Sequence, residues 1–302
     1  MANLEKIQMN DSGLQFSKFI QGYWRMAGWN MSNQEYLTFL NKHVELGITT
    51  VDHAHIYGSP SCEMLFGEVL KLQPSIRDEI EIVSKCGIQL PCNKSGAVAH
   101  YRSDAKSILE SVDLSLSRFG VERIDALLIH RPDFLMDADE VAEAFKTLES
   151  AGKVHSFGVS NFSTSQFSLL QSRLDKPLIT NQIEINPINM QSLEDGQLDY
   201  LTEHNVIPMA WSCLGGGRIL SDTSETMQKA RATLAPLVQE VGAESIDQLM
   251  FAWVLTLPSK PLPIIGSGKI DRVASAVKSA EIVLNREQWY RIWTAFKGHA
   301  VP

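Results

Sequence analysis

The sequence lacks the features of several protein classes. No run of apolar residues approaches membrane length, and Met1 to Asp11 contains no apolar signal core. The four cysteines are scattered without a CxxC pair, which favours reduced thiols over a disulfide framework or a zinc cluster. No Lys/Arg-rich stripe appears, and the formal net charge of -8 argues against a nucleic-acid surface. We therefore expect a cytoplasmic protein with no membrane, nucleic-acid or obligate protein partner.

Several catalytic motifs are missing as well. No G-x-G-x-x-G follows the first predicted strand, which argues against an open, doubly wound dinucleotide-binding sheet. Neither an H-E-x-x-H motif nor a Cys–His pair at metal-binding spacing is present, so we expect no metal site. No serine lies in a G-x-S-x-G elbow, which argues against a serine hydrolase. Proton transfer is the chemistry that remains.

What the sequence does contain is a repeat of short apolar strands and amphipathic helices. The unit recurs about eight times with no internal linker, which favours a single (β/α)8 TIM barrel domain over residues 1–302. Asp11-Ser12-Gly13 predicts a short N-terminal β-hairpin, and extra helices are expected near the C-terminus. One helix is expected over Leu193–His204. The predicted strands are Ile20–Trp24, Ile48–Val51, Glu79–Cys86, Ile124–Ile129, Val154–Val159, Leu178–Ile183, Val206–Ala210 and Leu262–Ile265.

Polar residues follow one predicted strand after another. In a barrel these strand ends meet on one face, where barrel enzymes place their sites. Each residue alone has a simpler interpretation: a helix-capping Asp52 with Tyr57 packed on it, a solvent-reaching Lys85, a loop histidine at His130. Their joint occurrence favours a site. The strand-end residues are Asp52, Lys85, His130, Ser160, Asn161, Gln182, Trp211, Ser212, Gly266 and Ser267.

These groups could transfer a proton together. A phenol has a pKa of roughly 10, and an ammonium beside it favours the phenolate, so we expect Lys85 to lower the pKa of Tyr57. Asp52 would keep Lys85 charged and oriented, and His130 would hydrogen-bond a substrate carbonyl oxygen. A proton donor with a carbonyl-binding group implies an external hydride donor, because no side chain supplies hydride.

At this point the sequence resembles the aldo-keto reductase family over almost its full length, in particular bacterial NADPH-dependent oxidoreductases. The matching segments are Thr50–Tyr57, Val83–Lys85, Leu127–Asp133, Gly152–Val154, Gly158–Phe162 and Asn181–Gln182. The resemblance implies a catalytic tetrad of Asp52, Tyr57, Lys85 and His130, with Tyr57 as proton donor. It also implies that Ser160, Asn161 and Gln182 hold the nicotinamide carboxamide.

The resemblance extends to the rest of a dinucleotide site. Trp211 stands where many members stack the nicotinamide on a tyrosine; the alternative is a core tryptophan. The glycine-rich run Ser212–Arg218 follows it. Its three glycines allow close backbone approach, which suits a diphosphate; the alternative is a flexible surface loop. The helix predicted to begin at Asp271 has cations near its N-terminus, and such an N-terminus is an anion site. The family uses this region for the adenosine 2′-phosphate, so the resemblance implies NADPH. Ala276 replaces a polar residue that often contacts the adenine. The expected cofactor contacts beyond Trp211 are Ser212, Leu214, Gly216 and Arg218 in the run, and Ser267, Lys269 and Arg272 at the helix.

We therefore predict an NADPH-dependent reductase of small aldehydes or ketones. The alternative is a regulatory dinucleotide-binding protein with little turnover, like the channel-associated members of the superfamily. Tyr23, Trp24 and Trp29 near the first strand end, with Arg131 and the residues up to Met136, are expected to line the mouth. These aromatic residues suggest an apolar or aromatic carbonyl.

Overall fold

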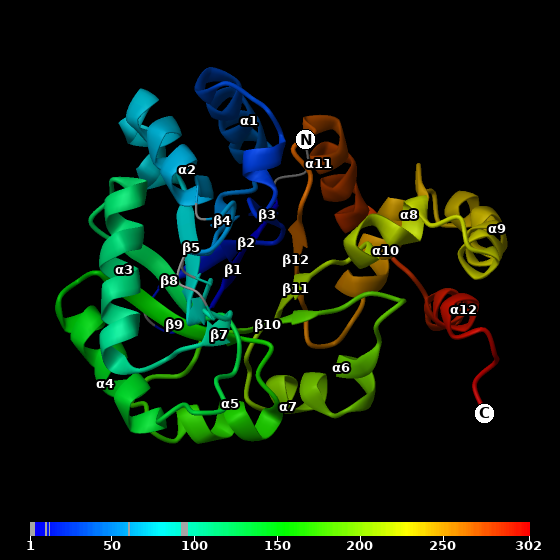
Figure 1. Cartoon of the computed structure of the whole chain (residues 1–302). Coiled ribbons are helices and arrows are strands. Elements are labelled where there is room, and N and C mark those ends of the chain that lie inside the picture. Colours follow the sequence, from blue (N-terminus) through cyan, green and yellow to red (C-terminus); the bar gives the residue numbers. More distant parts are fainter. Residues whose placement is uncertain (1–3, 10, 12, 60, 92–95) are drawn as a thin grey trace.

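Eight parallel strands close into a barrel in a computed structural model that describes residues 4–9, 11, 13–59, 61–91 and 96–302 (Figure 1). Around the barrel the strands run in the order β10-β11-β12-β3-β4-β5-β8-β9. This closed sheet confirms the predicted TIM barrel. The bounds are β3 Ile20–Gly22, β4 Thr50–Asp52, β5 Glu81–Cys86, β8 Ile124–Ile129, β9 Val154–Ser160, β10 Asn181–Glu184, β11 Met209–Trp211 and β12 Leu262–Ile265.

Helices cover the outside of the barrel, so the strands are buried on both faces. Every residue of β8 is buried, for example, as its unbroken apolar run requires. The helices around the barrel are α1 Asn33–Glu45, α2 Ser61–Leu72, α3 Ala105–Phe119, α4 Ala138–Ser150, α5 Thr164–Gln171, α6 Gln191–Glu194, α7 Gln197–Glu203, α10 Ile246–Leu255 and α11 Ile270–Lys278. Among the described residues, no helix is long and apolar enough to cross a membrane.

The expected hairpin at the N-terminus is present. Strands β1 (Lys6–Gln8) and β2 (Gln15–Ser17) pair antiparallel, and Asn10 and Ser12 of the intervening turn lie outside the described residues. Met9, Leu14 and Phe16 are buried against side chains that fill the barrel, such as Leu128 and Met209. The hairpin thus closes the N-terminal end of the barrel, which leaves the opposite end for a site.

The extra helices also lie near the C-terminus, as expected. They are α8 (Arg218–Ser221) and α9 (Glu225–Glu240) after β11, and α12 (Arg286–Lys297) at the end of the chain. Helices α9 and α12 lie side by side at one edge of the molecule (Figure 1). Trp289 of α12 stacks on Trp253 of α10 with ring centroids 4.8 Å apart, which fixes α12 to the barrel.

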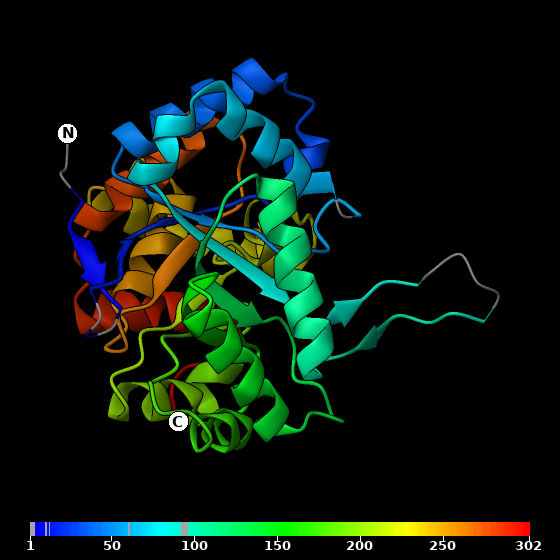
Figure 2. The same ribbon diagram turned by 90° about the vertical axis from the view of Figure 1, so that its left-hand side faces the viewer.

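The clearest differences from the prediction concern one helix, two strands and a second hairpin. The single helix expected over Leu193–His204 is two helices, α6 and α7, because Gly196 between them has a φ of 80°. Strands β10 and β11 begin at Asn181 and Met209, a few residues later than expected. A second hairpin, β6 (Ile88–Gln89) with β7 (His100–Tyr101), follows β5 and extends away from the barrel (Figure 2).

Candidate active site

The side chains of Asp52, Lys85 and Tyr57 meet at the C-terminal ends of β4 and β5. The Lys85 ammonium is fully buried and lies 2.8 Å from the Asp52 carboxylate, to which it donates a hydrogen bond. It also donates to the His53 carbonyl oxygen at 2.7 Å and to the Tyr57 hydroxyl oxygen at 3.1 Å. An ammonium has three N–H donors, and these contacts use all three. Asp52 thus belongs to this network, and α2 begins only at Ser61.

The direction of these hydrogen bonds leaves the hydroxyl proton of Tyr57 without an acceptor among the described residues. Tyr57 accepts from Lys85, so its own O–H points elsewhere, and none of the described residues accepts it. His130, at the end of β8, lies beside the phenol: the two rings are 5.7 Å apart and nearly perpendicular. The site therefore presents a hydroxyl donor next to an imidazole.

The protonation states of the pair differ from the expectation. Burial raises the pKa of the Tyr57 phenol, and the Lys85 ammonium offsets this only in part. Lys85 lowers the pKa of Tyr57 as expected, but it does not bring the phenol toward working pH, because desolvation of the phenolate outweighs the charge. Burial also works to lower the pKa of Lys85, but Asp52 and the Tyr57 oxygen outweigh it, so that pKa is raised. Tyr57 is thus a neutral, proton-bearing acid beside a charged lysine.

His130 is a neutral imidazole. Burial lowers its pKa well below the usual value, and the nearby charge of Lys85 lowers it further. Its Nδ1 atom is buried without a hydrogen-bond partner among the described residues. A neutral ring retains one N–H, which can be donated to a ligand oxygen.

The polar residues after β9 and β10 connect to this network. Gln182 donates to Asp52 Oδ1 at 2.8 Å, and Ser160 donates to the Gln182 carbonyl oxygen at 2.8 Å. Asn161, which has a φ of 60°, donates to Ser160 Oγ at 2.8 Å and accepts from the Trp211 indole N–H at 3.1 Å. The residues expected near the nicotinamide are therefore brought together beside Asp52.

Trp211 lies half-buried on this rim rather than in the core. The Arg131 guanidinium lies 5.8 Å from the centroid of its ring. Among the described residues, Arg131 has no hydrogen-bond acceptor and no ion-pair partner. A cavity of about 330 Å³ opens beside Trp211 and Arg131. It is lined mostly by polar side chains of β10 and of the segments that follow β9 and β10, including Asn161, Gln166, Glu184 and Gln191.

The glycine-rich run after β11 has positive φ angles at its three glycines. Gly215, Gly216 and Gly217 have φ values of 58°, 69° and 99°, which other residues rarely adopt. Ser212 also has a positive φ, of 54°, and Leu214 is half-buried. The Arg25 guanidinium donates to the Gly216 carbonyl oxygen at 3.3 Å, a contact across the chain that no sequence pattern indicated. Arg218 is exposed, 3.8 Å from Asp222.

Two cations, Lys269 and Arg272, lie at the start of α11. Lys269 and Arg272 are exposed, and neither has an ion-pair partner among the residues that the structure describes. Ser267 accepts from the Lys269 backbone N–H at 3.2 Å. The helix N-terminus and these two cations are suited to bind a phosphate. Ala276 is fully buried on α11 and packs in the core.

One of the aromatic residues expected at the mouth, Tyr23, lies elsewhere. Tyr23 is 1% exposed, donates to His43 Nε2 at 2.8 Å and stacks on His53, so the prediction that it lines the mouth is wrong. Its side chain points outward from the barrel, toward α1 and α2. Trp29 packs over Gly268, on the loop before α11, and 5.6 Å from the Tyr23 ring. Trp24 is 60% exposed.

One residue of the site has a role that the sequence did not reveal. His55 lies between Asp52 and Tyr57, and its two ring nitrogens face the carbonyl oxygens of Lys85 and Ile88 at 2.7 Å and 2.8 Å. The only sign in the sequence is its place in the Asp52–Tyr57 segment. No spacing rule predicts these contacts, because they depend on the turn between β5 and β6.

Comparisons with known proteins agree with this geometry. Residues 18–295 match the model of the Aldo/keto reductase family. The chain is 51% identical to the oxidoreductase YdhF of Escherichia coli over 99% of this chain and all of that protein. It is 38% identical to a 6-dehydroglucose reductase of Agrobacterium fabrum, again over 99% of this chain and all of that protein. A glycerol dehydrogenase from Gluconobacter oxydans has the same fold, with a TM-score of 0.85 at 23% identity over 99% of this chain and 97% of that one. Because this family model covers nearly the whole chain, and the E. coli oxidoreductase is 51% identical over its full length, this chain belongs to the aldo-keto reductase family of oxidoreductases.

Proposed function

We propose that this oxidoreductase reduces an aldehyde or ketone with NADPH, and that Tyr57 donates the proton to the carbonyl oxygen. The observation that carries the proposal is the direction of the Lys85 hydrogen bonds. Because Lys85 donates to the Tyr57 oxygen, the phenol proton is left for an acceptor outside the described residues. A buried, neutral phenol beside an ammonium is suited to protonate an alkoxide as it forms.

Each neighbour of Tyr57 has its own role. NADPH, when bound, supplies the hydride. Lys85 stabilises the phenolate that remains after proton transfer, because an opposite charge 3.1 Å away favours it. Asp52 holds Lys85 charged and oriented. The neutral His130 donates its one N–H to the substrate oxygen and so orients the carbonyl.

The cofactor occupies the rim and the loops of strands β9 to β12. In this proposal the nicotinamide lies on the Trp211 ring, with its carboxamide held by Ser160, Asn161 and Gln182. The positive-φ glycines let the backbone approach the diphosphate closely. The unpaired charges at α11 select the 2′-phosphate of NADPH, since anions are stabilised at a helix N-terminus. The diphosphate contacts are Ser212, Leu214, Gly216 and Arg218, and the 2′-phosphate contacts are Ser267, Lys269 and Arg272.

The substrate in this proposal is a hydrophilic carbonyl compound, such as the aldehyde form of an oxidised sugar. Burial of Tyr23 removes part of the basis for an apolar substrate. The unpaired Arg131 guanidinium offers five N–H donors to hydroxyl or carbonyl oxygens. Polar side chains line the adjoining cavity, and a relative of 38% identity is named a 6-dehydroglucose reductase.

Cofactor absorbance in the purified protein tests the proposal. NADPH is mixed with a panel of sugar-derived, aliphatic and aromatic aldehydes and ketones. We expect NADPH consumption that is fastest with the sugar-derived aldehydes. Tight NADPH binding without consumption on any member of the panel would favour the regulatory dinucleotide-binding alternative. Faster turnover of aromatic aldehydes would contradict the proposed substrate class while leaving the reaction intact.

A further inference from the structure

The contacts of His55 differ from those of an ordinary histidine. Nδ1 lies 2.7 Å from the Lys85 carbonyl oxygen, and Nε2 lies 2.8 Å from the Ile88 carbonyl oxygen. The same Lys85 oxygen also accepts the backbone N–H of His55 at 3.1 Å. Both ring nitrogens therefore face backbone carbonyls at hydrogen-bond distance.

A carbonyl oxygen accepts hydrogen bonds and cannot donate them. A neutral imidazole has one N–H, so it could satisfy only one of these two carbonyls and would turn a lone pair toward the other. An imidazolium donates from both nitrogens and satisfies both. The arrangement around His55 is thus complete only when the ring carries two protons.

Two other histidines of the same region show the contrast. His43 Nδ1 donates to the Ile48 carbonyl oxygen, and its Nε2 accepts from the Tyr23 hydroxyl, so a neutral ring satisfies both contacts. Burial lowers the pKa of His43 to about 4. His53 is fully buried, and neither of its ring nitrogens has a partner among the described residues. Of these three, only His55 meets two obligate acceptors.

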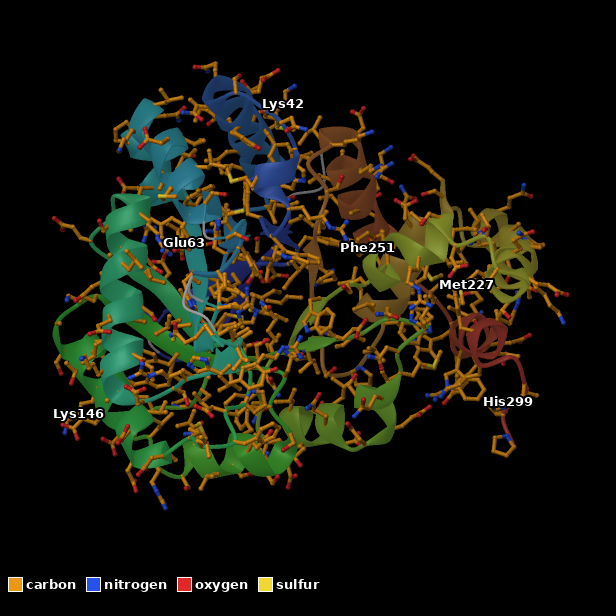
Figure 3. The ribbon with its side chains drawn as sticks, in the orientation of Figure 1. Lys42, Glu63, Lys146, Met227, Phe251 and His299 are labelled. Atoms are coloured by element: carbon orange, nitrogen blue, oxygen red, sulfur yellow. The ribbon has the colours of Figure 1, made fainter. Side chains whose placement is uncertain are left out.

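The cations that neighbour His55 are each paired with a carboxylate, so their repulsion of a positive charge on His55 is reduced. Arg118 of α3 donates to the His55 carbonyl oxygen at 3.0 Å and pairs with the buried Glu63 of α2 at 3.1 Å (Glu63 is labelled in Figure 3). Lys85 of β5 faces Asp52. Each neighbouring cation thus has its own carboxylate, while His130 and Tyr57 are neutral. His55 is itself only partly buried, so solvent helps to stabilise its charge.

His55 joins three segments, two of which carry reacting groups. It lies on the loop that leads to Tyr57, Lys85 lies one residue before the end of β5, and Ile88 begins the projecting hairpin. We infer that His55 is held as an imidazolium and acts as a positioning residue that fixes the Tyr57 hydroxyl against the Lys85 ammonium. It touches neither substrate nor cofactor, and its catalytic effect depends on the function proposed above.

Nuclear magnetic resonance of the protein labelled with ¹⁵N-histidine tests the charge directly. The difference between the parent spectrum and that of His55→Asn assigns the two ring nitrogens among the eight histidines. At pH 7 we expect both His55 nitrogens to resonate as protonated N–H groups. His43, the internal reference, should show one protonated and one unprotonated nitrogen. A neutral tautomer at His55 under these conditions would overturn the inference, whether or not the protein turns over any carbonyl.

Variants test the positioning role. Asn retains a donor near Nδ1, Gln retains one near Nε2, and Leu retains neither. We expect His55→Leu to lower kcat tenfold or more, with NADPH affinity within twofold of the parent, and His55→Asn and His55→Gln to fall between. The matched control is His204→Asn. His204 is exposed and lies directly after α7, so this change should leave kcat unchanged.

The outcomes separate the two proposals. Retained kcat in His55→Leu, or equal losses in Leu, Asn and Gln, would overturn the positioning role. Absence of turnover in the parent itself would count against the proposed function and not against the imidazolium, which the ¹⁵N spectrum reports. Circular dichroism of each variant excludes misfolding, and should His55→Leu misfold, the Asn and Gln variants carry the comparison.

Discussion

The two ends of the proposed site are built in opposite ways. At the proton-transfer end, Lys85 is buried and every N–H of its ammonium already has an acceptor within the protein. At the phosphate end, Lys269 and Arg272 are exposed, and within the described residues neither has a counter-ion. The chain itself supplies every partner at the first end, whereas the proposal assigns an anion, the cofactor phosphate, to the second.

This difference follows from what each end must do. Catalytic groups gain from fixed geometry, because a barrier is lowered only by groups already aimed at the reacting atoms. A buried charge also requires a partner, and Lys85 has Asp52. Binding groups at a surface lose little by remaining solvated until the ligand arrives. Changes at the proton-transfer end should therefore affect kcat, and changes at the phosphate end should affect cofactor affinity.

The largest expected effect comes from removing the phenol proton. Tyr57→Phe should lower kcat by roughly 10²- to 10⁴-fold, the usual contribution of a general acid, and leave NADPH affinity nearly unchanged. Steady-state kinetics on the best carbonyl of the panel and fluorescence titration with NADPH measure the two quantities. Tyr101→Phe, on the exposed strand β7, is the matched control and should leave both unchanged. Turnover of Tyr57→Phe within a few-fold of the parent would remove Tyr57 from the mechanism.

The second effect is a pH-dependent loss of folding stability caused by His43, which is buried in the core. The pKa of His43 is lowered to about 4 in the folded protein, against 6.5 in the unfolded chain. The unfolded state therefore binds the extra proton first, so the stability that His43 contributes is present above pH 6.5 and is lost as pH falls toward 4. A shift of this size corresponds to about 3 kcal/mol. Urea unfolding at pH 7 and pH 5 should show part of this loss, because pH 5 lies between the two pKa values, and His43→Gln should show a smaller one.

The contrast also explains how much the sequence could predict. Strands β8 and β12 occur at the predicted residues, because an unbroken apolar run bounded by turns has one good solution in a barrel. The adjacency of Asp52, Lys85 and His130 follows from the convergence of strand ends. Hairpin β6–β7 was missed because strands of two residues have no periodicity to detect.

Three features lay beyond sequence reasoning because they depend on packing. The pKa direction of Tyr57 depends on how much protein covers the phenol, which no local pattern reports. Tyr23 follows Gly22 at the end of β3, and its side chain points outward to His43 rather than toward the mouth. His55 depends on the path of the chain after β5, where Gly87 has a φ of 99°.

The third prediction tests the phosphate end. Arg272→Ala should weaken NADPH binding by about 1.5–3 kcal/mol, or roughly ten- to a hundredfold, because a charge-assisted phosphate contact is lost. NADH, which lacks the 2′-phosphate, should bind the variant and the parent equally. Arg286→Ala is the matched control, an exposed arginine in the first turn of α12 with no ion-pair partner among the described residues. Equal losses for NADPH and NADH would show that Arg272 does not read the 2′-phosphate.

The smallest expected effect lies between the two ends, at Trp211. This indole is half-buried on the rim, its N–H is held by Asn161 at 3.1 Å, and the Arg131 guanidinium lies 5.8 Å from its ring centroid. Trp211→Ala should weaken NADPH binding by about 1 kcal/mol, or roughly fivefold, with little change in the melting temperature of the cofactor-free protein. Trp253→Ala offers the opposite case: that indole is fully buried, so its loss should cost roughly 3–5 kcal/mol of stability. Fluorescence adds a direct readout, because NADPH should quench the parent more strongly than Trp211→Tyr. Undiminished quenching in Trp211→Tyr, with unchanged NADPH affinity in Trp211→Ala, would place the nicotinamide elsewhere on the rim.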